Sequence, residues 1–307
     1  MDSHWDKYCT MSIVHFMAYP GAMGGEGPIA ATVSKIAEDP FFGMIEVTWV
    51  KDPKERAAVR DVIQASHLRV AFGAQPVVLM GKLNPNSLDE AERRAAVEAL
   101  EARIDEAVEL GAGRLAFLSG KDPGDADRPA AFDALVRSTK ELCAYGAERG
   151  VGITVETFDR TVDKKALIGP SDFAAEYAAA VRDEYPDFGL MYDLSHQPIL
   201  FEESEPALTL LKPHLAHIHV GNAVREEGLP GYGDQHPRFG WPGGCNDVDE
   251  LVTFIRALFT VGYLGDGKTN GTRPVVGFEV KPQSEHETSE QVIAGTKRVW
   301  QDAWALA

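Results

Sequence analysis

The chain has only three cysteines, and it has no long apolar run. Cys9, Cys143 and Cys245 show no Cys-x-x-Cys spacing, and a chain of this length needs no disulfide framework. No apolar stretch reaches the length that crosses a bilayer, which excludes a membrane-spanning protein. The sparse cysteines and the lack of a signal-peptide pattern predict a cytoplasmic, reducing location.

Basic residues are also scarce. The chain carries 30 Lys and Arg against 47 Asp and Glu, a formal net charge of −17. A nucleic-acid partner would require clustered Lys and Arg, so this balance disfavours one and fits a small neutral or metal-bridged substrate better. The length of 307 residues suits one large domain covering positions 1–307.

The chain does contain a regular alternation of short apolar runs and amphipathic segments. Strands are predicted at Ser12–Ala18, Met44–Val50, Arg69–Phe72, Arg114–Leu118, Gly152–Val155, Phe188–Tyr192, Leu215–Val220 and Val275–Phe278. Helices are predicted from Pro28, over Pro53–Ser66, after a capping box of Ser87 and Glu90, up to Gly150, and over Ser171–Asp183, Pro206–Leu211, Val248–Leu258 and Ser289–Ala305. About eight strand–helix units predict an α/β fold, a (βα)8 TIM barrel.

Four acidic or histidine residues each follow an apolar run in the second half of the chain. They are Glu156, Asp193, His219 and Glu279. Taken singly, a strand-end carboxylate is more often a helix cap or a surface charge, and a lone histidine is more often part of the core. The C-terminal strand ends of a barrel converge on one face, however, so the shared position predicts one divalent-metal site. Three carboxylates and one imidazole favour Mn²⁺, with Mg²⁺, Co²⁺ or Zn²⁺ as alternatives.

One long irregular segment, 222–246, follows the predicted strand that carries His219. It is rich in Gly, Pro and aromatic residues, and a loop of this length in a compact domain is usually functional or disordered. Its aromatic content favours a role at the substrate mouth, with His236 and Arg238 as candidate substrate-binding residues. For Phe239 and Trp241, packing alone is the alternative. His217 is assigned to the opposite side of its strand from His219 and is predicted to be structural.

A phosphate-binding motif is matched only formally, by Gly262, Gly267, Lys268 and Thr269. Its mechanism needs a strand before the loop and a helix after it, whose amides bind the phosphate. The residues that follow, 270–274, break helices. A polar turn is therefore predicted here instead of a nucleotide site.

Several short strings resemble the metal and substrate motifs of ketose 3-epimerases, within the xylose-isomerase-like superfamily of sugar isomerases and epimerases. The strings are Val155–Glu156, Tyr192–His196, His217–Asn222 followed by Arg225, and Phe278–Glu279. The resemblance covers nearly the whole chain. It implies metal binding by the four residues named above, and contacts of His196 and Arg225 with substrate oxygens.

Two positions depart from the epimerase pattern. Asn222 stands where the epimerases have Glu, and Val162 stands where they have a second substrate-binding Glu. A further resemblance, carried by Tyr232–Gly240 together with Gly73–Pro76, is to the catalytic subunits of bacterial C-glycoside deglycosidases. Those enzymes enolise a 3-oxo sugar and expel an aromatic aglycone, usually with a small second subunit.

All of these enzymes begin by removing a proton from a carbon next to a carbonyl. Glu156 and Glu279 are the candidate bases, and His196 is a candidate acid or base. The leading hypothesis is a deglycosidase catalytic subunit that acts on 3-oxo-C-glycosides. The alternatives are a ketose 3-epimerase or sugar isomerase and, outside enzymes, a metal-stabilised sugar-binding protein. An oligomer is expected, and a small partner subunit belongs to the leading hypothesis.

Overall fold

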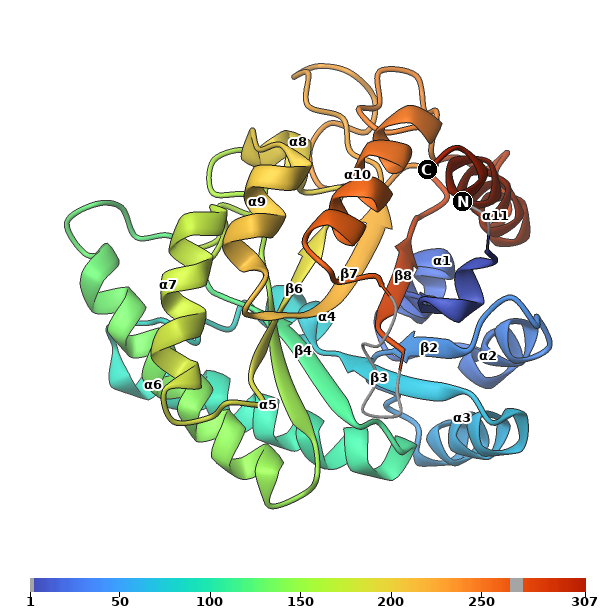
Figure 1. Ribbon diagram of the computed structural model, residues 1–307. Coiled ribbons are helices and arrows are strands. Elements are labelled where there is room, and N and C mark those ends of the chain that lie inside the picture. Colours follow the sequence, from blue (N-terminus) through green and yellow to red (C-terminus); the bar gives the residue numbers. More distant parts are fainter. Residues whose placement is uncertain (1–2, 266–272) are drawn as a thin grey trace.

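Eight parallel strands form one sheet in the computed structural model, which describes residues 3–265 and 273–307 (Figure 1). The strands are β1 Thr10–Ile13, β2 Met44–Val47, β3 Arg69–Gly73, β4 Arg114–Leu118, β5 Gly152–Glu156, β6 Gly189–Asp193, β7 Leu215–Gly221 and β8 Val275–Glu279. Their order is β1-β8-β7-β6-β5-β4-β3-β2, and a parallel bridge between Val14 and Glu46 joins the two ends of the sheet. The predicted (βα)8 TIM barrel is confirmed.

Helices surround the strands on the outside of the barrel (Figure 1). The longer ones are α2 Ile29–Ala37, α3 Pro53–Ser66, α5 Glu90–Leu110, α6 Arg128–Ala147, α7 Ser171–Arg182, α9 Ser204–Leu211, α10 Val248–Thr260 and α11 Ser289–Leu306. The short ones are η1 Trp5–Lys7, α1 His15–Ala18, η2 Pro20–Ala22, α4 Gln75–Gly81 and α8 Gln197–Leu200. In Figure 1 the two chain ends lie close together, and the Trp304 indole donates to the Ser3 carbonyl at 2.9 Å.

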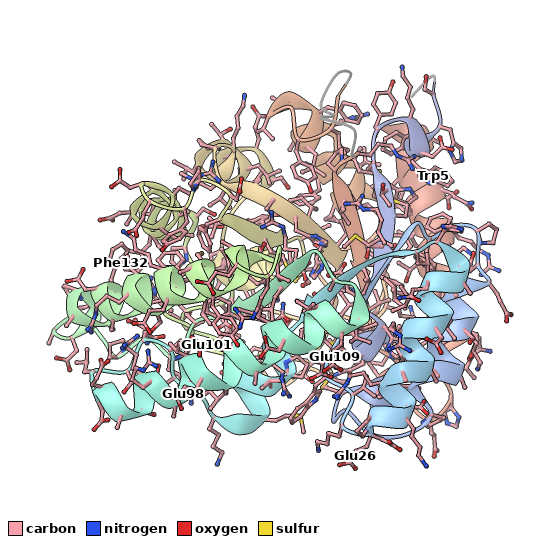
Figure 2. The ribbon with its side chains drawn as sticks, turned by 90° about the horizontal axis from the view of Figure 1, so that it is seen from below. Trp5, Glu26, Glu98, Glu101, Glu109 and Phe132 are labelled. Carbon is pink, nitrogen blue, oxygen red and sulfur yellow. The ribbon has the colours of Figure 1, made fainter. Side chains whose placement is uncertain are left out.

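Helix α5 shows how the sequence pattern produces the packing. Its predicted apolar face is fully buried, and it comprises Val97, Leu100, Ile104 and Ala107. The acidic residues Glu98 and Glu109 are exposed along the same helix, beside α6 (Figure 2). The predicted capping box is wrong, because Asp89 is the cap and accepts from the Glu92 amide at 3.0 Å. The Ser87 hydroxyl is used instead in a hydrogen bond to the Glu92 carboxylate.

The main errors of element assignment lie at the C-terminal ends of strands. The first strand ends at Ile13 instead of Ala18, because the chain turns into α1 at His15. Neither α4 nor α8 is predicted from the sequence, since short apolar runs do not distinguish a strand from one or two helical turns. Helices α1 and α4 follow β1 and β3 directly, so these unpredicted pieces lie at the face where the strand ends converge.

The three cysteines form no disulfide. Among the residues that the structure describes, no helix is long and apolar enough to cross a membrane. Of the formal phosphate motif, Gly267, Lys268 and Thr269 lie outside the described residues. The polar turn predicted there stays a prediction.

Candidate metal centre

Four side chains from four neighbouring strands meet inside the C-terminal end of the barrel. Glu156, Asp193 and Glu279 are the last residues of β5, β6 and β8, and His219 lies on β7. Asp193 is directly opposite His219 across β6 and β7. Each residue offers one possible ligand atom, and these four atoms lie within 4.8 Å of one another. The structure therefore brings together all four predicted metal ligands, each less than a tenth exposed.

One buried polar atom of each of these side chains makes no hydrogen bond to any residue outside this group of four, and is called unpartnered in that sense. The four atoms are Glu156 Oε1, Asp193 Oδ2, His219 Nδ1 and Glu279 Oε2. His219 Nδ1 and Glu279 Oε2 lie 2.7 Å apart as an ion pair, and the other two atoms are left without a partner, which is unfavourable for buried polar atoms. One cation in the shared space would serve all four. Three anionic oxygens and one imidazole nitrogen form a donor set that suits a divalent cation. The residues present therefore fit the implied metal.

The other polar atom of three of these side chains is fixed by a neighbour. Gln75 Nε2 donates to Glu156 Oε2 at 2.8 Å, and the Ser195 amide donates to Asp193 Oδ1 at 2.7 Å. His219 Nε2 lies 2.8 Å from Glu46 Oε2. Such outer contacts orient metal ligands and fix the histidine tautomer. The unpartnered atoms are therefore directed toward one another by the surrounding structure.

A second cluster of histidines and acids adjoins the first. Asp234 Oδ1 lies 3.0 Å from His196 Nε2 and 2.6 Å from His236 Nε2, and Asp234 Oδ2 lies 2.9 Å from Lys164 Nζ. His196 Nδ1 donates to the Thr157 carbonyl at 2.7 Å. Both nitrogens of His196 are thus engaged, and its side chain is fully buried. Its geometry suits an orienting or proton-holding role beside the centre.

The carboxylates around these histidines raise their pKa values. Burial alone would lower the pKa of His236, but Glu279 and Asp234 raise it to about 9. Burial opposes the charged ring of His219 too, yet Glu46 and Glu279 raise its pKa well above the usual range. Burial raises the pKa of Asp193. In the absence of a cation the cluster therefore holds protons, which metal binding must displace.

We expect the metal-free protein to lose stability as the pH rises from about 6.5 to about 9. The pKa of His236 is near 6.5 when the chain is unfolded and about 9 when it is folded, so its contribution is complete below pH 6.5 and lost through pH 9. The upper limit of the His236 contribution to the free energy of unfolding is about 3 kcal/mol. Denaturant unfolding of chelator-treated protein at the two pH values measures it. His236→Gln should reduce the difference, and an unchanged pH dependence in that variant would contradict the assignment.

A pocket of about 180 Å³ opens over the centre. Its polar side includes Glu46, His219, Asp234, His236 and Glu279, and it also contains Lys164 and Lys281. The apolar part of its lining, called the apolar wall, is formed largely by α1, α4 and the segment after α1, with Phe16, Met17, Met23, Pro76, Leu79 and Met80. Leu79 is 43% exposed and Met80 is 55% exposed, so apolar side chains reach the mouth of the pocket.

Two predicted substrate-binding arginines lie elsewhere. Arg225 is exposed, with its guanidinium 5.7 Å from the ring centre of Phe201, and it borders a separate groove. Arg238 Nε donates to Glu287 at 3.0 Å, and neither arginine is among the described residues that line the pocket over the centre. Of the predicted substrate-binding residues, His236 lines the pocket and His196 is buried behind it.

The loop 222–246 reaches the pocket through a short part of its length. Asp234, Gln235 and His236 line the pocket, whereas Phe239 is buried and the Trp241 indole donates to the Pro230 carbonyl at 3.0 Å. His236 has a positive φ of 50°, a strained conformation for a non-glycine residue. Phe239 therefore packs into the main hydrophobic core and Trp241 packs within the loop, and the apolar wall of the pocket comes from other segments.

Sequence reasoning did not assign a role in the site to Glu46, Gln75, Lys164, Asp234 or Lys281. Gln75 and Asp234 do lie in the strings that resemble the deglycosidases. The sequence does distinguish Glu46, because it is the only charged residue in the apolar run Met44–Val47, and a charge inside a buried strand indicates a functional contact. The assignment of His217 to the opposite side from His219 is wrong, because residues two apart on a strand share a face. The rings of both histidines contact Glu46.

Comparison with known proteins identifies relatives of this barrel. The family model described as xylose isomerase-like TIM barrel matches residues 37–265. No curated protein matches the chain. Similar solved structures include a D-allulose 3-epimerase from Methylomonas sp., at 19% identity and a TM-score of 0.66 over 96% of this chain and 98% of that one. An L-ribulose 3-epimerase has 14% identity and a TM-score of 0.68 over 97% and 98%. The IOLI protein with a binding zinc atom has 14% identity and a TM-score of 0.73 over 97% and 98%. At these identities the structural likeness establishes the fold alone.

Proposed function

Because the chain belongs to the xylose isomerase-like TIM barrel family, we propose that it is a divalent-metal-dependent sugar enzyme that removes a proton from a carbon next to a carbonyl. The observation that carries this proposal is the set of four unpartnered ligand atoms within 4.8 Å at the base of a pocket. A cation held by these residues would supply positive charge that stabilises the enediolate. Mn²⁺ is our first choice, and the zinc of one structural neighbour keeps Zn²⁺ as an alternative.

The position of Glu279 favours it as the base. Glu279 lines the pocket and is 7% exposed, whereas Glu156 is 1% exposed and has one oxygen held by Gln75. Both the group that removes a proton and the group that returns one must come within hydrogen-bond reach of the carbon. Glu156 can do so only through Oε1, the oxygen that Gln75 does not hold. Glu156 comes from β5 and Glu279 from β8, so two carboxylates approach the centre from different sides. We assign Glu279 to proton removal and Glu156 to returning a proton on the other face of the enediolate.

This pair of carboxylates supports an epimerase or isomerase outcome. Epimerisation needs one group to remove a proton and a second group to deliver one to the opposite face. The two solved 3-epimerases with similar folds support the same choice. We therefore place ketose 3-epimerase or sugar isomerase ahead of the deglycosidase suggested by the loop strings.

One observation keeps the deglycosidase as a second candidate. The apolar wall with its exposed Leu79 and Met80 offers a surface for an apolar substituent on the sugar. The departure at Asn222 supports neither candidate directly. Its Nδ2 donates to the Arg238 carbonyl at 2.9 Å, and its Oδ1 accepts from the Asn246 backbone N–H at 2.8 Å. The Asn222 side chain therefore stabilises the conformation of the loop 222–246. A small second subunit is required only by this second candidate, and an oligomer stays a prediction.

A product assay separates the candidates. The Mn²⁺-loaded protein is incubated with a set of free ketoses and, separately, with an oxidised C-glucoside, with and without candidate small subunits. Appearance of the C3 epimer or the aldose isomer supports the first candidate, and aglycone release supports the second. Bound metal and bound sugar with no turnover of any substrate would contradict both and favour a metal-stabilised sugar-binding protein.

The placement of the loop residues gives a matched pair of variants. His236→Gln is expected to lower kcat by about 10–100-fold, because His236 contacts Asp234 and lies 3.5 Å from the Glu279 carboxylate. Arg238→Gln should leave kcat within about twofold, since its contacts are to Glu287 and loop carbonyls. Steady-state kinetics on the identified substrate measure both. A larger loss in Arg238→Gln than in His236→Gln would contradict this placement.

A further inference from the structure

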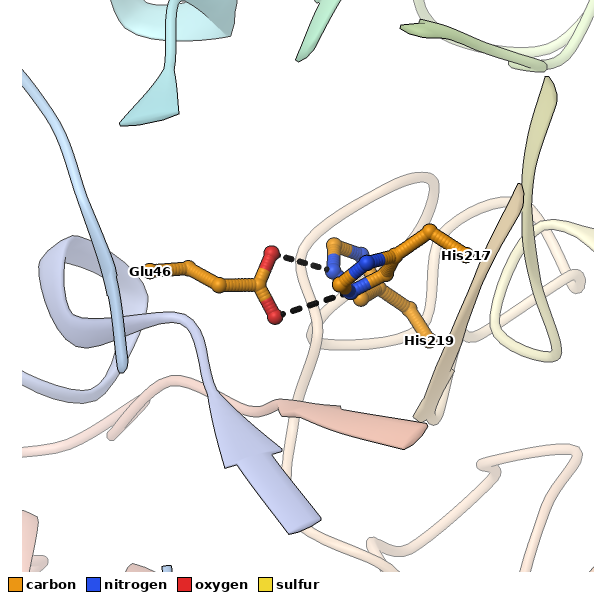
Figure 3. Close-up of side chains that lie close together, drawn as sticks. All are labelled: Glu46, His217 and His219. Carbon is orange, nitrogen blue, oxygen red and sulfur yellow. Dashed lines mark hydrogen bonds and ion pairs between the residues drawn. The ribbon is translucent and has the colours of Figure 1, made fainter. Parts of the chain in front are cut away.

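Glu46 contacts two histidines at once, and one of them is the candidate metal ligand His219 (Figure 3). Its Oε1 is 3.0 Å from His217 Nε2, and its Oε2 is 2.8 Å from His219 Nε2. Glu46 comes from β2 and is 3% exposed, while both histidines come from β7, which β1 and β8 separate from β2 around the barrel. This buried carboxylate, absent from the predicted site, therefore connects the barrel wall to a predicted metal ligand.

The contact determines which nitrogen of His219 faces the carboxylates of the centre. An ionised carboxylate can only accept hydrogen bonds, so the ring nitrogen next to Glu46 must carry the hydrogen. In a neutral imidazole the other nitrogen, Nδ1, then has a free lone pair. Without a cation that nitrogen holds a proton toward Glu279 Oε2 at 2.7 Å, and it lies 3.6 Å from Glu156 Oε1; a bound cation would replace this proton. Glu46 thus directs a lone pair into the space shared by the four candidate ligands.

The neighbouring strand leaves room for this arrangement. Gly277 on β8 is opposite His219 in the sheet register. A Cβ at Gly277 would lie 2.5 Å from Glu46 Oε1 and 2.9 Å from His219 Cδ2, closer than real Cβ contacts. Any other residue at position 277 would therefore displace Glu46 or His219. His217 occupies the second oxygen of Glu46, which fixes the carboxylate plane relative to both rings.

We propose that Glu46 is a positioning residue that sets metal affinity by holding His219 with Nε2–H toward itself and Nδ1 toward Glu156 and Glu279. The inference rests on the proposed metal function of the four-residue centre. Loss of an outer contact of this kind costs about 10–100-fold in metal affinity. Glu46 borders the pocket, but His217 and His219 engage both of its oxygens, so its effect should appear in metal binding before it appears in catalysis.

The main test is Glu46→Gln, which keeps the shape and removes the charge. An amide presents one oxygen and one NH₂ group, so it can accept from only one imidazole N–H and presents its hydrogens to the other ring. We expect the dissociation constant for Mn²⁺ to rise about 10–100-fold in a competition titration. In the metal-free variant, at a pH high enough to leave His219 neutral, the ¹⁵N shifts of His219 should move from the Nε2–H form toward a mixture of tautomers. Neither readout should move if Glu46 only fills space.

Two further variants keep the test decisive. Gly277→Ala displaces the same contact sterically without changing any donor or acceptor, and it is expected to weaken Mn²⁺ binding by at least tenfold. Ile45→Val is the matched control, because it alters a fully buried residue next to Glu46 on the same strand. It should lower the unfolding temperature and leave the Mn²⁺ dissociation constant unchanged. If Glu46→Gln does not fold, Gly277→Ala decides the question.

The outcomes separate this inference from the proposed function. Wild-type Mn²⁺ affinity in folded Glu46→Gln or Gly277→Ala would overturn the positioning role and leave the metal centre standing. Failure of the wild-type protein to bind Mn²⁺ or Zn²⁺ would overturn the metal centre itself, and this inference with it. An equal loss of affinity in Ile45→Val would also overturn the positioning role, because it would show that general destabilisation explains the effect.

Discussion

Asp193→Asn is expected to abolish metal retention and turnover together. Asp193 is fully buried at the end of β6, and its unpartnered Oδ2 is one of the four candidate ligand atoms. Changes to outer contacts of a metal ligand cost about 10–100-fold in affinity, so loss of a charged ligand should cost more than about 100-fold. Metal content after gel filtration and the initial rate at saturating Mn²⁺ measure the two effects.

The control for this variant is another buried acid far from the centre. Glu106 on α5 accepts from the Val50 amide and lies near Arg56 and Arg103. Glu106→Gln should lower the free energy of unfolding and leave metal content unchanged, since a buried hydrogen-bonded acid outside the site serves stability only. Full activity of the wild-type protein after exhaustive chelation would contradict the metal requirement itself.

The fold and the four candidate ligands could be predicted because they depend on local pattern and one general rule. Short apolar runs separated by amphipathic segments predict a barrel, and convergence of its strand ends places Glu156, Asp193 and Glu279 together. Each of these carboxylates ends a strand whose position was predicted within two residues. The position of a side chain along a strand is therefore enough to assign it to the centre.

The outer contacts could not be predicted in the same way. Glu46 and Gln75 approach the centre from β2 and from the start of α4, and nothing in their local sequence states which ligand they contact. Arg225 and Arg238 show the opposite case. Both arginines lie in strings that resemble family motifs. Outside the pocket, however, Arg225 contacts the Phe201 ring and Arg238 donates to Glu287. Loop side chains depend on the path of the whole loop, which a motif does not specify.

The apolar wall could not be predicted either, because it is formed by short helices that were not assigned from the sequence. The residues after Ile13 form α1 instead of continuing the strand, and this turn brings Phe16 and Met17 to the pocket. Helix α4, which was not predicted, brings Leu79 and Met80 to the same wall. The aromatic loop 222–246 was the expected source of this surface. The apolar part of the pocket lining is therefore formed by α1, α4 and the segment after α1, and not by Phe239 or Trp241.

The remaining large effect is expected for Glu279→Gln, which tests the base. Glutamine keeps the shape and one oxygen of the side chain but cannot accept a proton from carbon. Positioned acid–base groups contribute about 10²–10⁴-fold, so kcat should fall by about that factor at saturating metal. Exchange of the substrate C–H hydrogen with deuterated solvent should fall in parallel, because this exchange reports proton removal before any product forms.

Metal content must be measured in the same samples, because Glu279 is also a candidate ligand. Glu287→Gln is the matched control, since Glu287 binds Arg238 outside the pocket and the substitution is chemically the same. It should leave kcat and solvent exchange unchanged. If Glu279→Gln retains its metal and exchanges the substrate hydrogen at the wild-type rate, the base is another group. Glu156 would then be the next to test, because its unpartnered Oε1 lies 3.6 Å from the same imidazole nitrogen that Glu279 faces.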